Sequence, residues 1–172
     1  MRDLGKVQKI SVDGLFIALT FVATFFLVFP LPAVGYFNIG DVMILLGGAM
    51  FGPVTGALSA IGAGLADLAL GYALYFPFTL VVKAVEGLMA GLLCYKKKTG
   101  WVFFAGIAIA GISMPVGYFL SEWLVLPLLD AEFGMAAAIV SIPLNTLQFA
   151  ISSVIACVIY ALLKKVLDQR QS

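Results

Sequence analysis

Four ionisable side chains interrupt otherwise apolar stretches of this sequence: Asp67, Lys83, Glu86 and Glu122. Carboxylate and ammonium groups are expensive to place in a bilayer, and where they occur they usually mark a ligand or ion path. Such groups bind a polar ligand through ion pairs and hydrogen bonds. The sequence therefore predicts a polar binding pocket inside an apolar protein.

Polar and aromatic side chains recur around these four residues at helical spacing. Residues three, four, seven or eight positions apart share one face of a helix. At a rise of about 1.5 Å per residue, the four ionisable groups lie within about 6–14 Å of one membrane surface. Three polar faces at one depth predict a single cavity. The first face consists of Tyr75, Thr79, Lys83 and Glu86, the second of Met114, Tyr118 and Glu122, and the third of Ser141, Asn145, Gln148 and Ser152.

The expected substrate contacts carry the hydrogen-bonding groups and aromatic rings that fix a small ligand in a pocket. They are Asn38, Asp67, Tyr75, Thr79, Lys83, Glu86, Tyr118, Glu122, Trp123, Asn145 and Gln148. Trp123, like Tyr36 and Tyr72, could instead belong to an interfacial belt of aromatic residues. Asp41 is expected to be a helix N-cap rather than a ligand contact.

Several of the expected contacts also have a structural explanation. Lys83 and Glu86 are spaced at i, i+3 and could neutralise each other. Asp67 could cap the backbone of the loop that follows it. Asn145 and Gln148 could form hydrogen bonds between helices.

The composition is that of a protein embedded in a membrane. The chain has 172 residues, of which 63% are hydrophobic and 11% charged, and its mean hydropathy is +1.12. Apolar runs recur along nearly the whole length, which predicts an all-α polytopic membrane protein with one domain over residues 1–172. Six transmembrane helices are expected, at about 13–30, 41–52, 54–71, 77–95, 101–127 and 135–163.

The orientation follows from the distribution of lysine and arginine. With six spans, nine of the ten basic residues lie on the side that holds both ends of the chain, and the opposite loops hold none. Because basic residues collect on the cytoplasmic side, both termini are predicted to be cytoplasmic and the pocket to face outward. The start of the chain, with Arg2, Lys6 and Lys9, also resembles a signal peptide; the spans that follow favour a retained first helix.

Several classes of function are disfavoured by what the sequence lacks. It contains no His and only two isolated cysteines, Cys94 and Cys157, so no metal site or cofactor is expected. The net charge of +1 gives no nucleic-acid signature. No G-x-x-x-x-G-K-[ST] phosphate loop and no nucleophile–His pair occur, so an enzyme is not expected and any ATP hydrolysis must come from a partner.

An ordered series of short motifs resembles a known family. It runs through Tyr36-Phe37-Asn38-Ile39-Gly40-Asp41, Gly52-Pro53 with Gly56-Ala57-Leu58, Ala66-Asp67-Leu68 with Gly71-Tyr72, and Pro77-Phe78-Thr79 with Lys83. The series is similar to that of the substrate-binding S components of energy-coupling factor (ECF) vitamin transporters. The similarity is strongest over residues 36–93.

The resemblance implies a bacterial plasma-membrane protein that captures a vitamin and works with a transmembrane coupling protein and two ATP-binding-cassette ATPases. It also implies that the loops 31–40 and 71–77 gate the pocket, through Tyr36, Phe37, Tyr72 and Phe76. Small residues on the first helix contact the coupling protein in this family. The matching positions here are Gly14 and Ala18.

The expected substrate follows from the charge of the cavity. Three carboxylates and one lysine disfavour phosphorylated or multiply anionic ligands. A small aromatic heterocycle with hydroxymethyl, amino or protonated ring-nitrogen groups fits better, which favours pyridoxine (vitamin B6) or hydroxymethylpyrimidine. The alternatives are riboflavin or another vitamin, and, in a different class, a self-sufficient small-molecule carrier; no inverted repeat or polar path to the cytoplasmic side supports the carrier.

Overall fold

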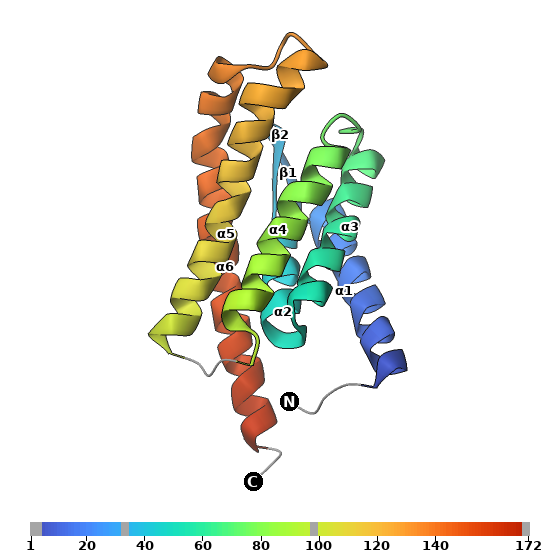
Figure 1. Cartoon of the computed structure of the whole chain (residues 1–172), viewed down its shortest axis with the longest axis vertical. Helices are drawn as coiled ribbons and strands as arrows, with labels where there is room; N and C mark the ends of the chain where they lie inside the picture. The colour runs from blue at the N-terminus through green and yellow to red at the C-terminus, as the bar shows by residue number, and fades with distance from the viewer. Residues whose placement is uncertain (1–4, 32–34, 97–99, 170–172) are drawn as a thin grey trace.

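The computed structural model describes residues 5–31, 35–96 and 100–169, which form a bundle of long helices with one short β-hairpin (Figure 1). In chain order the elements are α1 (Lys6–Phe26), β1 (Val28–Leu31), β2 (Gly35–Asn38), α2 (Gly40–Phe51), α3 (Pro53–Leu70), α4 (Phe76–Cys94), α5 (Trp101–Leu120), the π-helical turn η1 (Ser121–Val125), the 3-10 turn η2 (Leu126–Leu128) and α6 (Met135–Gln169).

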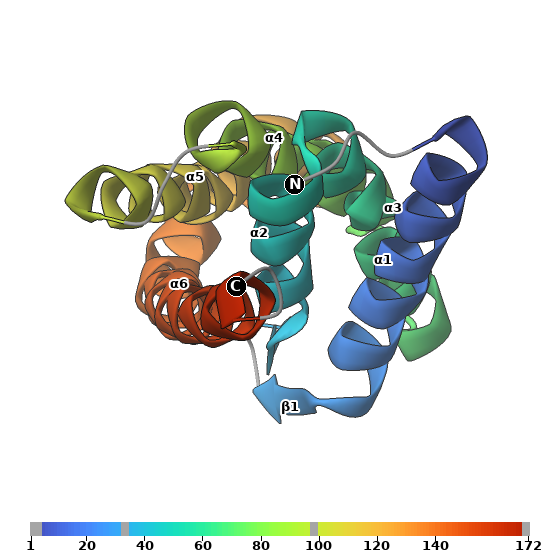
Figure 2. The same ribbon diagram turned by 90° about the horizontal axis from the view of Figure 1, so that it is seen from below.

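The short helix α2 is the centre of the bundle. Seen along the bundle axis, the other helices surround it (Figure 2), and nearly all of its residues are buried. Its sequence, GDVMILLGGAMF, is apolar on every side, as expected for a helix without a solvent- or lipid-facing surface. The hydrophobic core accordingly gathers around Val42, Leu45 and Ala49, against Phe103 and Ile107 of α5.

Five of the six predicted spans are helices long and apolar enough to cross a membrane: α1, α3, α4, α5 with its two terminal turns, and α6. The predicted span 41–52 is helical as well, but α2 has only 12 residues. At 1.5 Å per residue it is about 18 Å long, against a hydrocarbon core of about 30 Å. The hairpin β1–β2 continues the same segment toward the upper end of the bundle (Figure 1).

The hairpin corrects two predictions. The fold is not purely helical, because much of the predicted loop 31–40 is an antiparallel strand pair in which Phe29 lies opposite Phe37. The first helix therefore ends at Phe26 rather than at residue 30, and it begins earlier, at Lys6. Residues 32–34, at the tip of the predicted loop, lie outside the described part of the chain.

The runs of small residues bring helix backbones into contact. A Cβ atom on Gly56 of α3 would lie 2.2 Å from the carbonyl oxygen of Gly87 on α4, and one on Gly87 would lie 2.1 Å from that of Gly56. A Cβ atom on Gly62 would lie 2.1 Å from the carbonyl oxygen of Ile17 on α1. These glycines therefore allow the helix backbones to pack closely within the chain.

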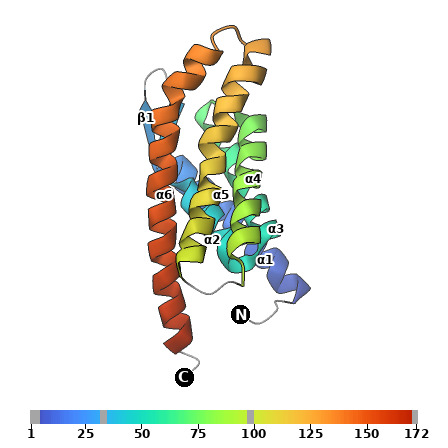
Figure 3. The same ribbon diagram turned by 60° about the vertical axis from the view of Figure 1, so that its left-hand side comes forward.

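The ends of the helices alternate between the two ends of the bundle (Figure 3). α1 begins and α6 ends at the lower end of Figure 1, where α2 also turns into α3. Gly52 makes this turn with a φ of +103°, a conformation that favours glycine. Proline does not interrupt the last helix, since α6 begins at Met135 and continues through Pro143.

Candidate functional site

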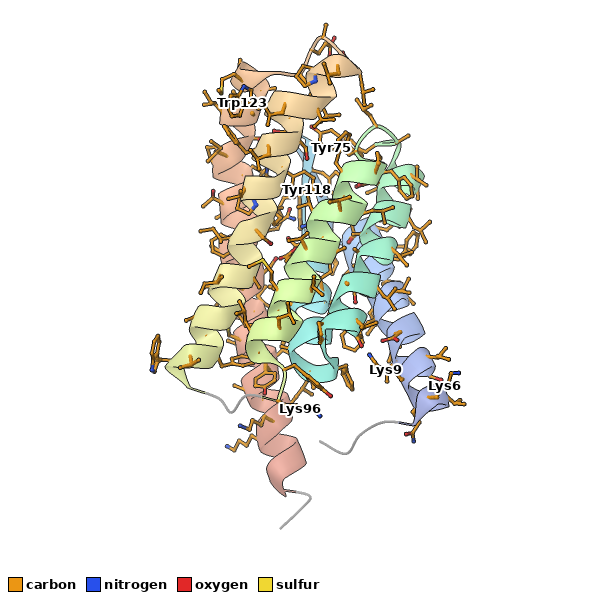
Figure 4. All side chains as sticks on the ribbon, viewed as in Figure 1. Lys6, Lys9, Tyr75, Lys96, Tyr118 and Trp123 are labelled. Atoms are coloured by element: carbon orange, nitrogen blue, oxygen red, sulfur yellow. The ribbon has the colours of Figure 1, made fainter. Side chains whose placement is uncertain are left out.

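A pocket lies in the half of the bundle opposite the chain ends. It encloses about 440 Å³ of empty space, including its opening. Tyr75 and Tyr118, which line it, lie in the upper half of the molecule (Figure 4), whereas Lys6, Lys9 and Lys96 lie at the lower end. The lining residues come from β2, the α3–α4 segment, α5, η1 and α6, and they are Tyr36, Asn38, Asp67, Tyr72, Tyr75, Thr79, Met114, Tyr118, Glu122, Asn145 and Gln148.

Most of the predicted contact residues meet in this wall. Eight of the eleven predicted substrate contacts line the pocket, and Tyr36 and Tyr72, predicted as gating residues, line it as well. Their role in binding a substrate stays a prediction. Met114 also lines the pocket; it lies on the predicted face of Tyr118 and Glu122, and only its apolar side chain kept it out of the expected contacts.

Three of the four tyrosine rings of the pocket are fixed by their hydroxyl groups. Tyr36 donates to a carboxylate oxygen of Asp67, and Tyr75 donates to Oε1 of Glu122 over 3.1 Å. The hydroxyls of Tyr118 and Thr79 are hydrogen-bonded over 2.8 Å. Anchored rings lose little conformational entropy when a ligand stacks on them, so the aromatic wall is organised in advance.

The four tyrosines form two neighbouring pairs. The ring centroids of Tyr36 and Tyr72 are 4.9 Å apart, and those of Tyr75 and Tyr118 are 6.3 Å apart. Both pairs are tilted, with interplanar angles of 48° and 53°. Tilted rings at these distances expose faces and edges on which a planar aromatic ligand can pack.

Glu122 joins three elements at one side of the pocket. It lies in the π-helical turn η1 and is 4% exposed. Its Oε1 accepts from Tyr75, and its Oε2 accepts from the hydroxyl of Ser141 on α6. Burial and the neighbouring Glu122 carboxylate raise the pKa of the Tyr75 hydroxyl, which precedes α4, so this hydroxyl remains a donor. π-helical turns recur at functional sites, where the extra residue redirects a side chain.

Asp67 is the second carboxylate of the wall and is 2% exposed. Its Oδ1 accepts from Tyr36, and its Oδ2 has no hydrogen-bond partner among the described residues. The interpretation of Asp67 as a loop cap is wrong. The amide groups of Gly71 and Tyr72 instead donate to the backbone carbonyls of Leu68 and Asp67, over 3.3 and 2.8 Å, which leaves the Asp67 side chain free to face the pocket.

A buried polar network lies next to the pocket and connects four elements. Gln148 accepts from the backbone amide of Asn38 over 3.0 Å and donates from Nε2 to Asp41 over 2.9 Å. Asp41 also forms an ion pair with Lys83, and Lys83 lies 3.6 Å from Glu86. The network therefore ties β2 and α2 to α4 and α6.

This network corrects three predictions. Asp41 is not an N-cap, because α2 begins at Gly40 with Ile39 in the cap position, and the Asp41 carboxylate faces Lys83 and Gln148. Lys83 and Glu86 are buried outside the pocket wall, and the alternative i, i+3 pairing is confirmed. Asp41 is a functional candidate that the sequence prediction missed. The signal for it was Lys83, a buried lysine that could take a second carboxylate partner besides Glu86.

Three of the predicted contact and gating residues, all of them aromatic, do not line the pocket. Trp123 is 39% exposed and packs on Phe119 with ring centroids 5.8 Å apart, and Figure 4 shows it on the outer side of the bundle. In η1 the side chain of Glu122 takes the inward position, so its neighbour Trp123 faces outward. Phe37 packs near Phe29 on the hairpin, with ring centroids 6.1 Å apart, and Phe76 packs beside Gly64 of α3.

The predicted docking residues lie on the outer face of α1. Gly14 and Ala18 are exposed, and a Cβ atom on Gly14 would meet no other atom within 4 Å. Ile10, Leu15 and Val22 around them are also exposed. The two small residues therefore lie on an exposed, largely apolar helix face, and the use of this face by a partner stays a prediction.

Apolar helices long enough to cross a bilayer and a polar pocket between them define a membrane-embedded binding protein. Residues 5–165 match the family described as "ECF-type riboflavin transporter, S component", and the chain belongs to this family of transporter binding subunits. The family resemblance seen in the sequence is confirmed.

Individual relatives agree with this assignment. The chain is 28% identical over 168 residues to the thiamine precursor transporter HmpT of Lactococcus lactis, covering 96% of this chain and 93% of that protein. It is 37% identical over 99 residues to an uncharacterized protein of Pyrococcus woesei, covering 56% of this chain and 66% of that protein, just under two thirds. A solved S component of a bacterial ECF transporter shares the fold, with a TM-score of 0.75, 24% identity, and coverage of 95% of this chain and 99% of that one.

Proposed function

We propose that this chain captures a small aromatic vitamin precursor of the hydroxymethylpyrimidine or pyridoxine type and delivers it to an ATP-driven importer. The observation that carries the proposal is the composition of the pocket wall. It holds two carboxylates, four tyrosines and several neutral hydrogen-bonding groups, and none of its described residues is basic. Such a wall repels anions and favours an uncharged or cationic ring with polar substituents.

A relative that matches nearly the whole chain also bears on the substrate. HmpT is a thiamine precursor transporter, and its similarity supports a pyrimidine precursor as the substrate of this chain. Riboflavin, with three fused rings and a ribityl chain, is the second candidate, because the matching family is named for it.

The orientation is part of the proposal. α1 begins and α6 ends at the lower end of the bundle (Figure 1), together with Lys6, Lys9 and Lys96 (Figure 4). By the positive-inside rule this end faces the cytoplasm, so both termini are cytoplasmic and the pocket faces the outside of a bacterial plasma membrane. The hairpin and α2 together then provide the second of six crossings.

The partners follow from the family and from the surface of α1. We assign ATP hydrolysis to two ATP-binding-cassette ATPases. A transmembrane coupling protein would connect them to this chain by contacting the face of α1 at Gly14 and Ala18. Tyr36, Phe37, Tyr72 and Phe76 are proposed to move with the segments 31–40 and 71–77 when the pocket opens. No cofactor and no metal enter this mechanism.

A ligand panel on the purified chain tests the substrate. We expect calorimetric titration to give tight binding of hydroxymethylpyrimidine or pyridoxine and weak binding of riboflavin. Tyr118→Ala should weaken binding about tenfold or more through the lost aromatic contact. Trp123→Ala is the matched control, since Trp123 lies outside the wall, and should leave the affinity unchanged. Tight binding of riboflavin and none of the single-ring compounds would overturn the proposed substrate.

A further inference from the structure

The two carboxylates of the pocket wall differ in how their oxygens are used. Both oxygens of Glu122 accept hydrogen bonds from protein hydroxyls, those of Tyr75 and Ser141. Asp67 uses only Oδ1, which accepts from Tyr36. Its Oδ2 is buried and has no hydrogen-bond partner within the described ranges, so the two carboxylates cannot serve a ligand in the same way.

Nothing in the described surroundings of Asp67 completes its hydrogen bonding. The hydroxyl of Thr79 is hydrogen-bonded to that of Tyr118 over 2.8 Å, and no group of the described residues is in hydrogen-bonding geometry to Oδ2 of Asp67. The nearby lysine, Lys83, forms ion pairs with Asp41 and Glu86. A buried carboxylate oxygen without a donor is costly, and a bound donor removes that cost.

In this inference, which rests on the proposed function, we propose that Asp67 determines substrate specificity: its Oδ2 accepts a hydrogen bond from an exocyclic amino group on the edge of the substrate ring. The substrate class that this subsite selects is an aminopyrimidine rather than a ring without an amino group. Asp67 supplies the acceptor, and the ring of the ligand packs on the neighbouring tyrosines.

The position of the aromatic rings supports this subsite. The hydroxyl of Tyr36 is bonded to Asp67, so one ring of the Tyr36–Tyr72 pair is held beside the carboxylate. The tyrosine faces attract a positively polarised ring, and this attraction adds to the charge-assisted hydrogen bond to Oδ2. The same arrangement rejects ligands that present a carbonyl or phosphate at this edge, because two acceptors would then face each other.

Gln148 and Glu122 do not provide the same selection. The amide oxygen of Gln148 accepts from the backbone of Asn38, and its amide nitrogen donates to Asp41. The Glu122 oxygens are occupied as described above. Of the charged groups in the wall, Asp67 is the one with a free acceptor.

The test is a comparison of two ligands on the intact, purified chain. The probes are 4-amino-5-hydroxymethyl-2-methylpyrimidine and its analogue with hydrogen in place of the amino group, each titrated calorimetrically. We expect the wild-type chain to bind the amino compound about 10- to 100-fold more tightly, as for a hydrogen bond to a charged group. In Asp67→Asn this ratio should fall below about threefold, and in the matched carboxylate control, Glu122→Gln, it should persist.

The possible results separate this inference from the proposed function. Equal binding of the two pyrimidines by the wild-type chain overturns the role of Asp67 and leaves the proposed function standing. An undiminished ratio in Asp67→Asn overturns it as well. Absence of binding to both pyrimidines and to pyridoxine refutes the proposed substrate class and the inference together. Because the comparison of the two pyrimidines on the wild-type chain can overturn the inference without any variant, the test remains valid even if Asp67→Asn fails to fold.

Discussion

Lys83→Met is expected to destabilise the protein without changing what it binds. Lys83 is 2% exposed and lies between the carboxylates of Asp41 and Glu86, which are 1% and 0% exposed. Removing one partner of a buried ion pair typically costs about 3–5 kcal/mol, because the other charge is left uncompensated. At about 2–4 °C per kcal/mol for a chain of this length, the melting temperature should fall by about 6–20 °C.

The source of this loss can be isolated with a double variant. Asp41→Asn combined with Lys83→Met removes one of the two carboxylate charges that Lys83→Met leaves without a cation, so the double variant should be more stable than Lys83→Met alone. Lys6→Met, at an exposed lysine, is the matched control and should change the melting temperature little.

Thermal unfolding in detergent and ligand titration at low temperature together distinguish a structural role of Lys83 from contact with the ligand. Because Lys83 does not line the pocket, the folded variant should retain its ligand affinity within about threefold. A large loss of affinity with an unchanged melting temperature would refute the reasoning, since it would mean that Lys83 contacts the ligand. A double variant no more stable than the single one would refute the assignment of the loss to Asp41.

Three further predictions follow from the packing, the polar network and the surface of α1. Gly56→Ala should destabilise the bundle by about 1–3 kcal/mol in thermal unfolding, because the new methyl group would meet the α4 backbone; Gly14→Ala is the control with open space, and equal effects would contradict the packing argument. Gln148→Met should speed amide exchange at Asn38 and ligand release about tenfold, by removing the hydrogen bond that holds β2 and the one that ties α6 to Asp41 of α2; unchanged exchange would count against this role. Gly14→Leu should leave ligand affinity intact and reduce co-purification with the coupling protein at least tenfold, and undisturbed assembly would exclude this face as the docking site.

The sequence predicted the pocket well because helical periodicity is a local property. The spacing of Tyr118 with Glu122, and of Asn145 with Gln148, places each pair on one helix face whatever the rest of the fold does. The distance of each residue from the end of its predicted span then indicated that these faces lie at one depth. The same reasoning placed Asp67 in the wall, and all five side chains line the pocket.

The remaining features depend on contacts between residues far apart in the chain. Lys83 and Asp41 are separated by 42 positions, and Gln148 and Asp41 by 107, so no local pattern links them. The hairpin was missed because its strands have four residues each, too short for a clear alternation. Trp123 was misplaced because it was included for its proximity to the face of Tyr118 and Glu122, although a residue next to Glu122 in the sequence does not share its helix face.

Uptake into proteoliposomes tests the account most directly. Vesicles containing this chain, the coupling protein and the two ATPases would be loaded with ATP on the side that holds the chain ends and supplied with labelled hydroxymethylpyrimidine on the other. We predict ATP-dependent accumulation of the labelled compound with the full set of subunits, and binding without accumulation by this chain alone. Gly14→Leu should abolish uptake. Accumulation by the chain alone, without ATP or partners, would contradict the account.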